Sequence, residues 1–280
     1  MTPVNSNAIL RAGIHILFYS CVAIIAWVVL QVFFLASFKV PTGSMEPEIW
    51  PGDYLLVSKP TYGARLFNLF PTLRLEQVNI YRAPGWRKVR RNDVVVFNNP
   101  YPHTPERMEM HILKYFVKRC IGLPGDSLRI ENGQYRVKGL HPENRPGRML
   151  HKPVPCYPND PAIQWNTREF GPLYIPARGD TLAMNRHHYI LYKTLIERET
   201  KGRLTLRDTA VYLNNRPLPS HIFHSDYYFM AGDNASHSQD SRHWGLVPGE
   251  YIAGKAWLIW KSVDPHTGTF RRERRMKIIH

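Results

Sequence analysis

Two residues in this sequence combine a reactive side chain with a setting in which it could do chemistry. Ser44 lies in the segment PTGSMEP, whose prolines and glycine favour an irregular backbone that can hold a hydroxyl in a fixed, exposed position. Lys118 lies in the apolar run YFVKRCIG, where strand alternation places it on one face with Phe116 and Cys120. Burial there would lower the lysine pKa, so that a neutral amine could accept a proton from a serine hydroxyl. Taken separately, each also fits an ordinary role, as a turn serine or as an edge-strand lysine whose amine reaches water.

Two further segments could position such a pair. In RRNDVVVFNNP, residues 90–100, Asn92 and Asp93 mark a turn before an apolar strand, which alone predicts only architecture. The segment GDNASHSQDSRHWGLVP, residues 232–248, is dense in Asp, Asn and Ser and contains Arg242. It fits either an ordinary polar turn tied by Asp–Arg pairing or a hydrogen-bonded scaffold that orients a catalytic base.

An apolar segment near the N-terminus precedes all four. Residues 12–38 contain no Asp, Glu, Lys or Arg, whereas a membrane-spanning helix needs about 20 apolar residues. A buried core helix would show a polar stripe, and a cleaved signal peptide would have an apolar core of only about 7–15 residues after a positive start. We therefore predict a retained transmembrane anchor, whose flanking Arg11 and Lys39 signal its orientation only weakly. The late run AWLIW, residues 256–260, is bounded by lysines and predicts a strand instead of a second span.

The remainder of the chain is expected to be mainly β. Short runs rich in Val, Ile, Tyr and Phe alternate with turn residues, and most of the 23 prolines follow residue 40. A short helix is predicted at Leu195–Glu199, and a long surface excursion at 140–178. The predicted strands include Tyr54–Val57, Val94–Phe97, Tyr115–Ile121, His188–Tyr192, Val211–Leu213 and Tyr227–Met230.

Composition limits the partners of the chain. The formal net charge of +15 suits nucleic acid, anionic lipid or acidic partners, but no zinc-finger spacing, basic zipper or aromatic RNA-binding signature is present, so no nucleic acid is expected. No CxxC or HExxH occurs, and the pair His187 and His188 is interpreted as a surface pair, so neither metal nor cofactor is expected. Three cysteines form no disulfide framework, and pairing of Cys120 with Cys156 stays open. The basic stretch RRERRMK, residues 271–277, fits a solvated tail or a contact with anionic lipid head groups.

The four segments, in this order and after an anchor, resemble the type I signal peptidases, a family of membrane-anchored Ser/Lys serine proteases. The resemblance rests on SMEP followed by GD, NDVVVF, KRCIGLPGD and GDNASHSQDSRHWG, and no motif is recognisable between these boxes. It implies a mainly β fold, in which an N-terminal transmembrane helix precedes a catalytic β core with a β-rich insertion. The implied divisions are a cytoplasmic segment 1–11, the anchor 12–38, the core 39–126 and 231–270, the insertion 127–230 and a basic tail 271–280.

The resemblance also implies residue roles. Ser44 matches the nucleophile, Lys118 the general base, and Thr42 an oxyanion-hole hydroxyl that would act with the Ser44 backbone N–H. Ser238 matches a serine that hydrogen-bonds the lysine, and Asn92 stands where relatives usually have a glycine, a change tolerated because Asn accepts positive φ. The matching supporting residues are Asp233, Asp240 and Arg242, and the matching substrate-pocket residues are Phe38, Val40, Met45, Leu55, Val96 and Val117.

The expected activity is cleavage of N-terminal signal peptides from exported precursor proteins, through an acyl-enzyme and after small residues at the first and third positions before the cut. The expected location is the bacterial cytoplasmic membrane, with one span, a cytoplasmic N-terminus and the catalytic domain outside. The expected partners are signal peptides and the phospholipid membrane. Three alternatives stay open: a self-cleaving Ser/Lys regulator, a specialised conjugation or pilus protease with the same core, and a non-enzymatic membrane scaffold.

Overall fold

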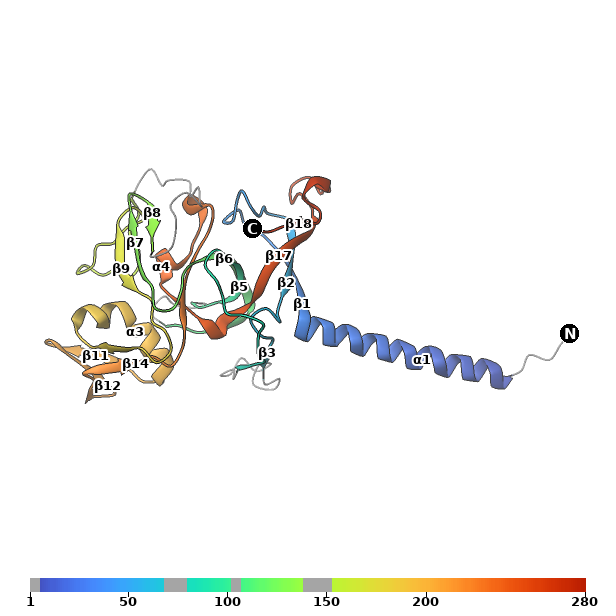
Figure 1. Ribbon diagram of the computed structural model, residues 1–280, viewed down its shortest axis with the longest axis horizontal. Helices are drawn as coiled ribbons and strands as arrows, with labels where there is room; N and C mark the ends of the chain where they lie inside the picture. The colour runs from blue at the N-terminus through green and yellow to red at the C-terminus, as the bar shows by residue number, and fades with distance from the viewer. Residues whose placement is uncertain (1–5, 68–79, 102–106, 138–152) are drawn as a thin grey trace.

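The computed structural model describes residues 6–67, 80–101, 107–137 and 153–280 (Figure 1). One long helix projects from a β-rich body, as the sequence predicts. The helical elements are α1 (Ser6–Val29), a π-helical turn (Leu30–Phe34), α3 (Arg186–Thr200), α4 (Ser241–Trp244) and 3-10 turns at Ala235–His237, Gly249–Tyr251 and Arg272–Arg274. The strands are β1 (Leu35–Lys39), β2 (Asp53–Ser58), β3 (Arg65–Phe67), β4 (Ile80–Arg82), β5 (Val94–Asn99), β6 (His111–Gly122), β7 (Ser127–Glu131), β8 (Gln134–Arg136), β9 (Phe170–Tyr174), β10 (Thr181–Ala183), β11 (Leu204–Arg207), β12 (Ala210–Leu213), β13 (Arg216–Pro217), β14 (Ser220–Ile222), β15 (Tyr227–Ala231), β16 (Val247–Pro248), β17 (Ile252–Ser262) and β18 (Lys277–Ile278).

The projecting helix is long and apolar enough to cross a membrane over Leu10–Phe34, and none of that stretch is buried against the body. The helical run begins at Ser6 and ends at Phe34, so the last four residues of the segment predicted as anchor, 35–38, are strand instead. Their backbone groups pair with β2, from Leu35 opposite Ser58 to Lys39 opposite Tyr54. The Lys59 amine donates to the carbonyls of Gln31 and Val32 at 2.6 and 3.2 Å, which fastens the end of the helix to the β domain.

The central sheet has eight strands, in the order β1-β2-β17-β5-β6-β15-β16 with β18 added beside β17. Every pairing in it is antiparallel. Smaller sheets, β8-β7-β9, β11-β12-β13, β10-β14 and β3-β4, surround it. The stretch 256–260 is part of β17, which confirms the prediction of a strand there.

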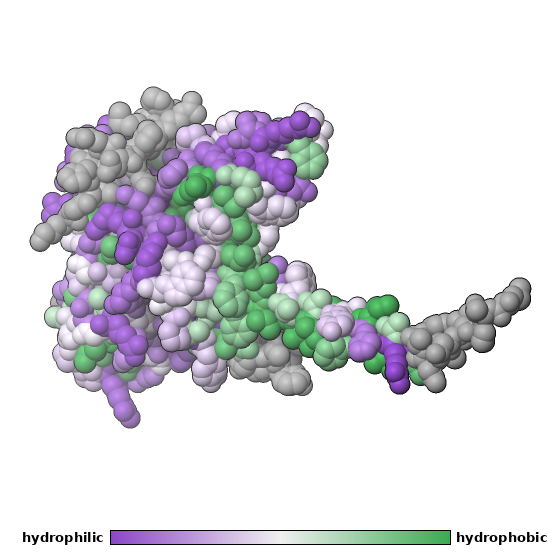
Figure 2. Space-filling view, turned by 45° about the vertical axis from the view of Figure 1, so that its right-hand side comes forward, coloured by the Kyte–Doolittle hydropathy of each residue, from purple (hydrophilic) through white to green (hydrophobic). Residues whose placement is uncertain are grey.

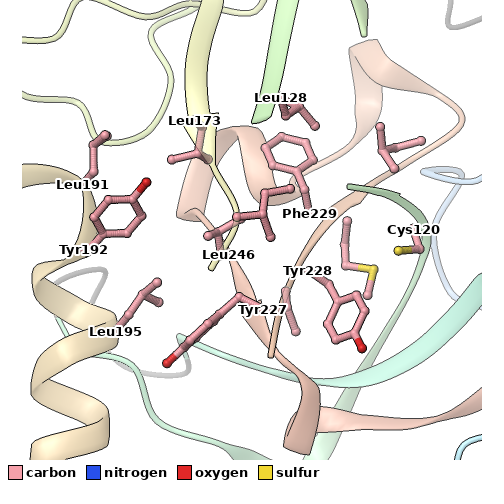
Figure 3. Packing of buried hydrophobic residues seen from close by; sticks show 14 of the residues in the cluster. Cys120, Leu128, Leu173, Leu191, Tyr192, Leu195, Tyr227, Tyr228, Phe229 and Leu246 are labelled. Atoms are coloured by element: carbon pink, nitrogen blue, oxygen red, sulfur yellow. The ribbon is translucent and has the colours of Figure 1, made fainter. Parts of the chain in front are cut away.

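The larger of two hydrophobic clusters among the described residues joins the central sheet to the segment predicted as an insertion. Phe229 of β15 lies among Leu128 of β7 and Leu173 of β9, while Leu191 projects toward them from α3 (Figure 3). Burial of such large apolar side chains stabilises each by about 1.5–3 kcal/mol relative to exposure. The insertion is therefore packed as part of the same body that carries Ser44 and Lys118.

One predicted strand is wrong. His188–Tyr192 lies within α3, and the helix predicted at Leu195–Glu199 is the second half of the same element. The Asn185 side chain caps this helix by accepting from the His188 backbone N–H at 2.8 Å. The buried residues of α3 fall on one helical face, because their spacing follows the 3.6-residue period; they are Leu191, Tyr192, Leu195 and Ile196.

Two surface predictions are also wrong in part. Of the excursion predicted at 140–178, residues 138–152 lie outside the described residues, but Cys156, Phe170 and Leu173 are buried in the core. The predicted solvated tail at 271–277 is folded onto the sheet: β18 pairs with β17, and Arg274 is buried in an ion pair with Asp53 at 2.6 Å. The charge of Arg274 is thus satisfied inside the protein.

Candidate active site

Ser44 and Lys118 meet in a buried hydrogen bond. The distance between Lys118 Nζ and Ser44 Oγ is 2.6 Å, and the two residues are 3% and 6% exposed, respectively. Ser44 lies in the turn between β1 and β2, whereas Lys118 lies on β6, where it stands opposite Val95 of β5. Because β5 is fixed on its other side by β17, the lysine is carried by the rigid centre of the sheet. The sequence-predicted pair, 74 residues apart in the chain, is therefore brought together.

Burial lowers the Lys118 pKa from 10.5 to about 8. The main cause is desolvation, which disfavours the ammonium form, and the positive charge of Arg242 acts in the same direction. The carboxylates of Asp240 and Asp233 oppose it by favouring the charged lysine. An amine with a pKa near 8 is partly neutral at physiological pH, and only the neutral form can accept the serine proton.

Asp240 and Arg242 form a buried, two-pronged ion pair beside the lysine. Arg242 Nε donates to Asp240 Oδ1 at 2.8 Å and Arg242 Nη2 donates to Asp240 Oδ2 at 2.7 Å. Desolvation by itself would raise the Asp240 pKa, but the Arg242 charge and the Gly232 backbone N–H hold that pKa below its usual value. Arg242 also donates to the Ala235 carbonyl at 2.9 Å, so the ion pair holds together the polar segment 232–248, which we call the polar loop.

Asp233 is held by Arg119, the residue after the lysine. Arg119 Nε and Nη2 donate to Asp233 Oδ1 and Oδ2 at 2.7 and 2.5 Å. Alternation on β6 directs neighbouring side chains to opposite faces, so Arg119 ties the polar loop to the strand without competing with Lys118. Arg119 was not among the residues predicted from the sequence, although its place directly after the lysine in KRCIGLPGD was a usable signal.

Asn234 is a second contact that sequence reasoning missed. Its backbone N–H donates to the Ser44 carbonyl at 3.1 Å, and its side-chain amide donates to the Gly43 carbonyl at 3.2 Å. Gly232 permits this approach, because a Cβ there would collide with the Ser44 carbonyl and with Ser238 Oγ. The polar loop thus positions the backbone on both sides of the serine peptide unit. Because Asn234 follows Gly43 by 191 residues, no local sequence signal could indicate this contact.

Two predicted residues are placed differently from the others. Thr42 lies at the exposed rim of the Ser44 turn. Ser238 is buried, but within the described part of the chain its Oγ makes no hydrogen bond to Lys118, so the bond implied by the resemblance is not formed. The turn residue Asn92 has φ of 74°, which confirms that asparagine takes the positive φ expected there.

The predicted pocket residues share one hydrophobic cluster next to Ser44. Val40, Met45, Leu55 and Val96 are at most 3% exposed, whereas Phe38 and Val117 are only partly buried against the cluster. Tyr115, which the sequence analysis did not include, contacts Phe38 with ring centroids 4.8 Å apart. Accessible apolar surface beside the serine therefore comes mainly from Phe38 of β1 and from Val117 in the middle of β6.

Cysteine chemistry plays no visible part in the site. Cys21, Cys120 and Cys156 are all free thiols, so the disulfide left open by the sequence is not formed. Burial raises the Cys120 pKa well above its usual range and the Cys156 pKa to about 12, which keeps both as inert thiols. Within the described ranges, one group of side chains could ligate a metal, Glu199 with His221 and His224, and it lies in the insertion.

A β domain that follows a helix able to span a membrane, and that brings a serine hydroxyl to a buried amine, is the arrangement expected of a membrane-anchored serine hydrolase. Comparison with known proteins narrows this class. The family described as signal peptidase, peptidase S26, matches residues 13–261, and the chain belongs to that family. It is accordingly a serine endopeptidase of signal-peptide processing.

Signal peptidases I from several bacteria are similar to this chain over most of its length. Signal peptidase I of Buchnera aphidicola subsp. Acyrthosiphon pisum is 26% identical over 84% of this chain and 71% of the relative. Signal peptidase I of Pseudomonas aeruginosa is 27% identical over 90% of this chain and 74% of the relative. Signal peptidase I of Rickettsia akari is 29% identical over 88% of this chain and 77% of the relative. The similarity thus extends far beyond the four motif boxes.

Proposed function

We propose that the chain cleaves signal peptides from exported precursors with Ser44 as nucleophile and neutral Lys118 as general base. The observation that carries the proposal is the 2.6 Å hydrogen bond between their buried side chains. As Ser44 Oγ forms a bond to the scissile carbonyl carbon, its proton passes to Lys118 Nζ. The resulting ammonium returns the proton to the leaving amine when the C–N bond breaks. A water then hydrolyses the acyl-enzyme, and Lys118 serves again as base.

The oxyanion is assigned to the Ser44 backbone N–H and the Thr42 hydroxyl. Neither group donates to another residue within the described ranges, and both lie on the turn that Asn234 positions. Such donors act because they are fixed before charge develops on the carbonyl oxygen. Removing one of them typically lowers the rate by about 10²–10³-fold.

An extended substrate fits between the free edges of two strands. Among the described residues, β1 pairs only with β2, so its other edge is free. The strand β6 pairs with β15 only over residues 119–122, so the part of β6 before Arg119 is free on that side. A peptide added between these edges would form backbone hydrogen bonds and run past Ser44. The pocket walls are already packed, apart from the surface of Phe38 and Val117, which favours small side chains at the first and third positions before the cut.

Membrane attachment would hold the site next to its substrate. The hydrophobic surface of α1 continues onto the β domain in Figure 2, and partly exposed tryptophans of β17, Trp257 and Trp260, add apolar area. Tryptophan is enriched at membrane–water interfaces because its ring is amphipathic. We assign the N-terminus to the cytoplasm and the β domain to the outer face, where signal peptides emerge.

Ser44→Ala is expected to abolish cleavage while leaving the fold intact, because the lost atom is the nucleophile and the alanine fills nearly the same space. The measurement is cleavage of a model exported precursor by the full chain in detergent, with circular dichroism to verify folding. Ser127→Ala, which changes an exposed serine of β7, is the matched control and should cut normally. Cleavage by the Ser44→Ala protein would remove Ser44 from the mechanism.

The same assay separates a general enzyme from a specialised one. Several unrelated precursors should be cut, each after a small residue. Cleavage of a single precursor alone would instead support the conjugation or pilus protease. The self-cleaving regulator predicts fragments of the chain itself, which Ser44→Ala would prevent.

Activity should rise with pH through the Lys118 pKa. A base with a pKa of about 8 is about 1% neutral at pH 6 and half neutral at pH 8, so kcat/KM should increase about 50-fold across this interval. Initial rates on the same precursor at fixed ionic strength measure the profile. A profile that stays flat from pH 6 to pH 9 would contradict this assignment of the base.

A further inference from the structure

A carboxylate and two imidazoles converge in the insertion, on the side of the body opposite α1 (Figure 1). Glu199 lies in the last turn of α3, His221 lies on β14, and His224 lies in the turn that follows β14. His221 Nε2 is 3.0 Å from Glu199 Oε2, and His224 Nδ1 is 3.5 Å from the same oxygen. All three candidate ligand atoms lie within 4.8 Å of one another.

These separations match those between ligands of one small cation. Zinc bonds to imidazole nitrogen and carboxylate oxygen are about 2.0–2.2 Å long, so tetrahedral neighbours lie about 3.3 Å apart. The two nitrogen–oxygen distances, 3.0 and 3.5 Å, lie on either side of this value. Two imidazoles and one carboxylate suit Zn²⁺ and similar borderline ions, whereas Mg²⁺ and Ca²⁺ prefer oxygen alone.

The carboxylate is already oriented for such a role. Its other oxygen, Oε1, accepts from the Tyr227 hydroxyl at 2.8 Å and from the Ser225 backbone N–H at 3.0 Å. Desolvation would raise the Glu199 pKa, but the hydrogen bonds from His221, Tyr227 and the His224 backbone lower it, so the group is ionised at neutral pH. Outer partners of this kind fix the direction of a ligand and are a regular part of metal sites.

A purely structural role explains only part of the arrangement. Glu199 satisfies the backbone N–H groups of His224 and Ser225, which would be reason enough for a buried carboxylate. The exposed His224 ring is not needed for that, since its side chain is 72% exposed and the capping uses only its backbone. Its Nδ1 nevertheless faces the same carboxylate oxygen as the His221 ring.

We propose that Glu199, His221 and His224 bind one Zn²⁺-class divalent ion, with water in the remaining position on the exposed side. The ion would fasten the end of α3 to the turn between β14 and β15 and would take no part in peptide cleavage. Motif searches miss the group because the histidines follow the glutamate by 22 and 25 residues, and no short ligand spacing signals them.

Zinc titration of the full chain in detergent tests the proposal. The protein should carry no polyhistidine tag and should first be treated with a chelator; calorimetry with Zn²⁺ alone should then show one tight site per chain. Loss of even an outer-shell partner costs about 10–100-fold in metal affinity, so His224→Ala, which removes a direct ligand, should weaken binding at least tenfold. Because its side chain is exposed, this variant should keep its fold, which unfolding without metal will verify.

The matched control is His266→Ala, another exposed histidine, which should leave the tight site unchanged. Co²⁺ gives a second readout, since a four-coordinate site with nitrogen ligands produces a visible absorption band that His224→Ala should remove. Absence of a one-to-one site in the wild type would overturn the proposal. So would a tight site whose affinity and Co²⁺ spectrum are unaffected by His224→Ala.

Discussion

Lys118→Met should abolish cleavage and, at neutral pH, make the protein more stable. Methionine has nearly the same length but no amine, so Ser44 loses its base, and a loss of about 10⁴-fold in kcat/KM is expected. The stability effect follows from the cost of holding a cation in a buried position. The Lys118 pKa shift from 10.5 to about 8 corresponds to about 3–4 kcal/mol, at about 1.4 kcal/mol per pKa unit.

The pH dependence of this stabilisation has a definite sign. Below pH 8 the lysine is protonated in both the folded and the unfolded wild type, so the folded protein bears the whole cost. Between pH 8 and pH 10.5 the folded state loses the proton while the unfolded state keeps it, and wild-type stability rises toward that of the variant. Above pH 10.5 the charge contribution to the difference vanishes.

Urea unfolding of both proteins from pH 7 to pH 10.5 measures this gap. Lys114→Met is the matched control, because Lys114 is exposed on the same strand and should change stability little at any pH. Lys118→Arg should be inactive as well, since a guanidinium cannot be deprotonated at these pH values. Normal turnover by Lys118→Arg would refute the general-base role, and a Met variant less stable than wild type at pH 7 would show that the amine is not desolvated.

Sequence alone was sufficient for the reactive residues but not for the contacts that position them. Ser44 and Lys118 stand in short motifs, so their identity could be predicted without knowing the fold. Asn234 could not, because its role depends on hydrogen bonds to the Gly43 and Ser44 carbonyls, and the presence of an asparagine in a polar loop does not specify such bonds. The same applies to Ser238, whose implied bond to the lysine is not formed.

Local composition also gave wrong predictions for segments whose structure depends on residues distant in the chain. The run His188–Tyr192 is too short to distinguish strand from helix, and its helical period appears only when Leu195 and Ile196 are read with it. Five basic residues in the segment 271–277 predicted solvation, yet Arg274 is buried against Asp53, 221 residues earlier in the chain. Periodicity and charge report on the local environment, whereas burial is set by tertiary contacts.

The buried pair of Asp240 and Arg242 should be the most sensitive structural element near the site. Asp240→Asn removes a carboxylate that is fully buried, and leaves the Arg242 charge, which is 2% exposed, without its partner. Breaking a buried pair from one side typically costs about 3–5 kcal/mol. We expect a loss of this size in urea unfolding, and a lower cleavage rate because the loop that positions Ser44 and Lys118 loosens.

The pH profile of the activity that remains in Asp240→Asn should show the electrostatic effect of losing the carboxylate. The Asp240 carboxylate favours the charged lysine, so its loss should lower the Lys118 pKa below 8 and move the rising limb of the pH profile to lower pH. A merely loosened fold would reduce the rate without moving this limb. An unshifted limb would show that Asp240 does not act on the charge of Lys118.

Two controls separate the ion pair from general damage to the protein. Glu131→Gln breaks an exposed pair with Arg136 and should change stability far less, because water screens that interaction. The double change Asp240→Leu with Arg242→Met should recover part of the stability lost in Asp240→Asn, since no unpaired charge stays buried. It should not recover cleavage, because the Arg242 contact to the Ala235 carbonyl and the Asp240 contact to the Gly232 N–H are both gone. A double variant as unstable as Asp240→Asn would mean that packing around the two side chains, and not their charges, sets the stability of the loop.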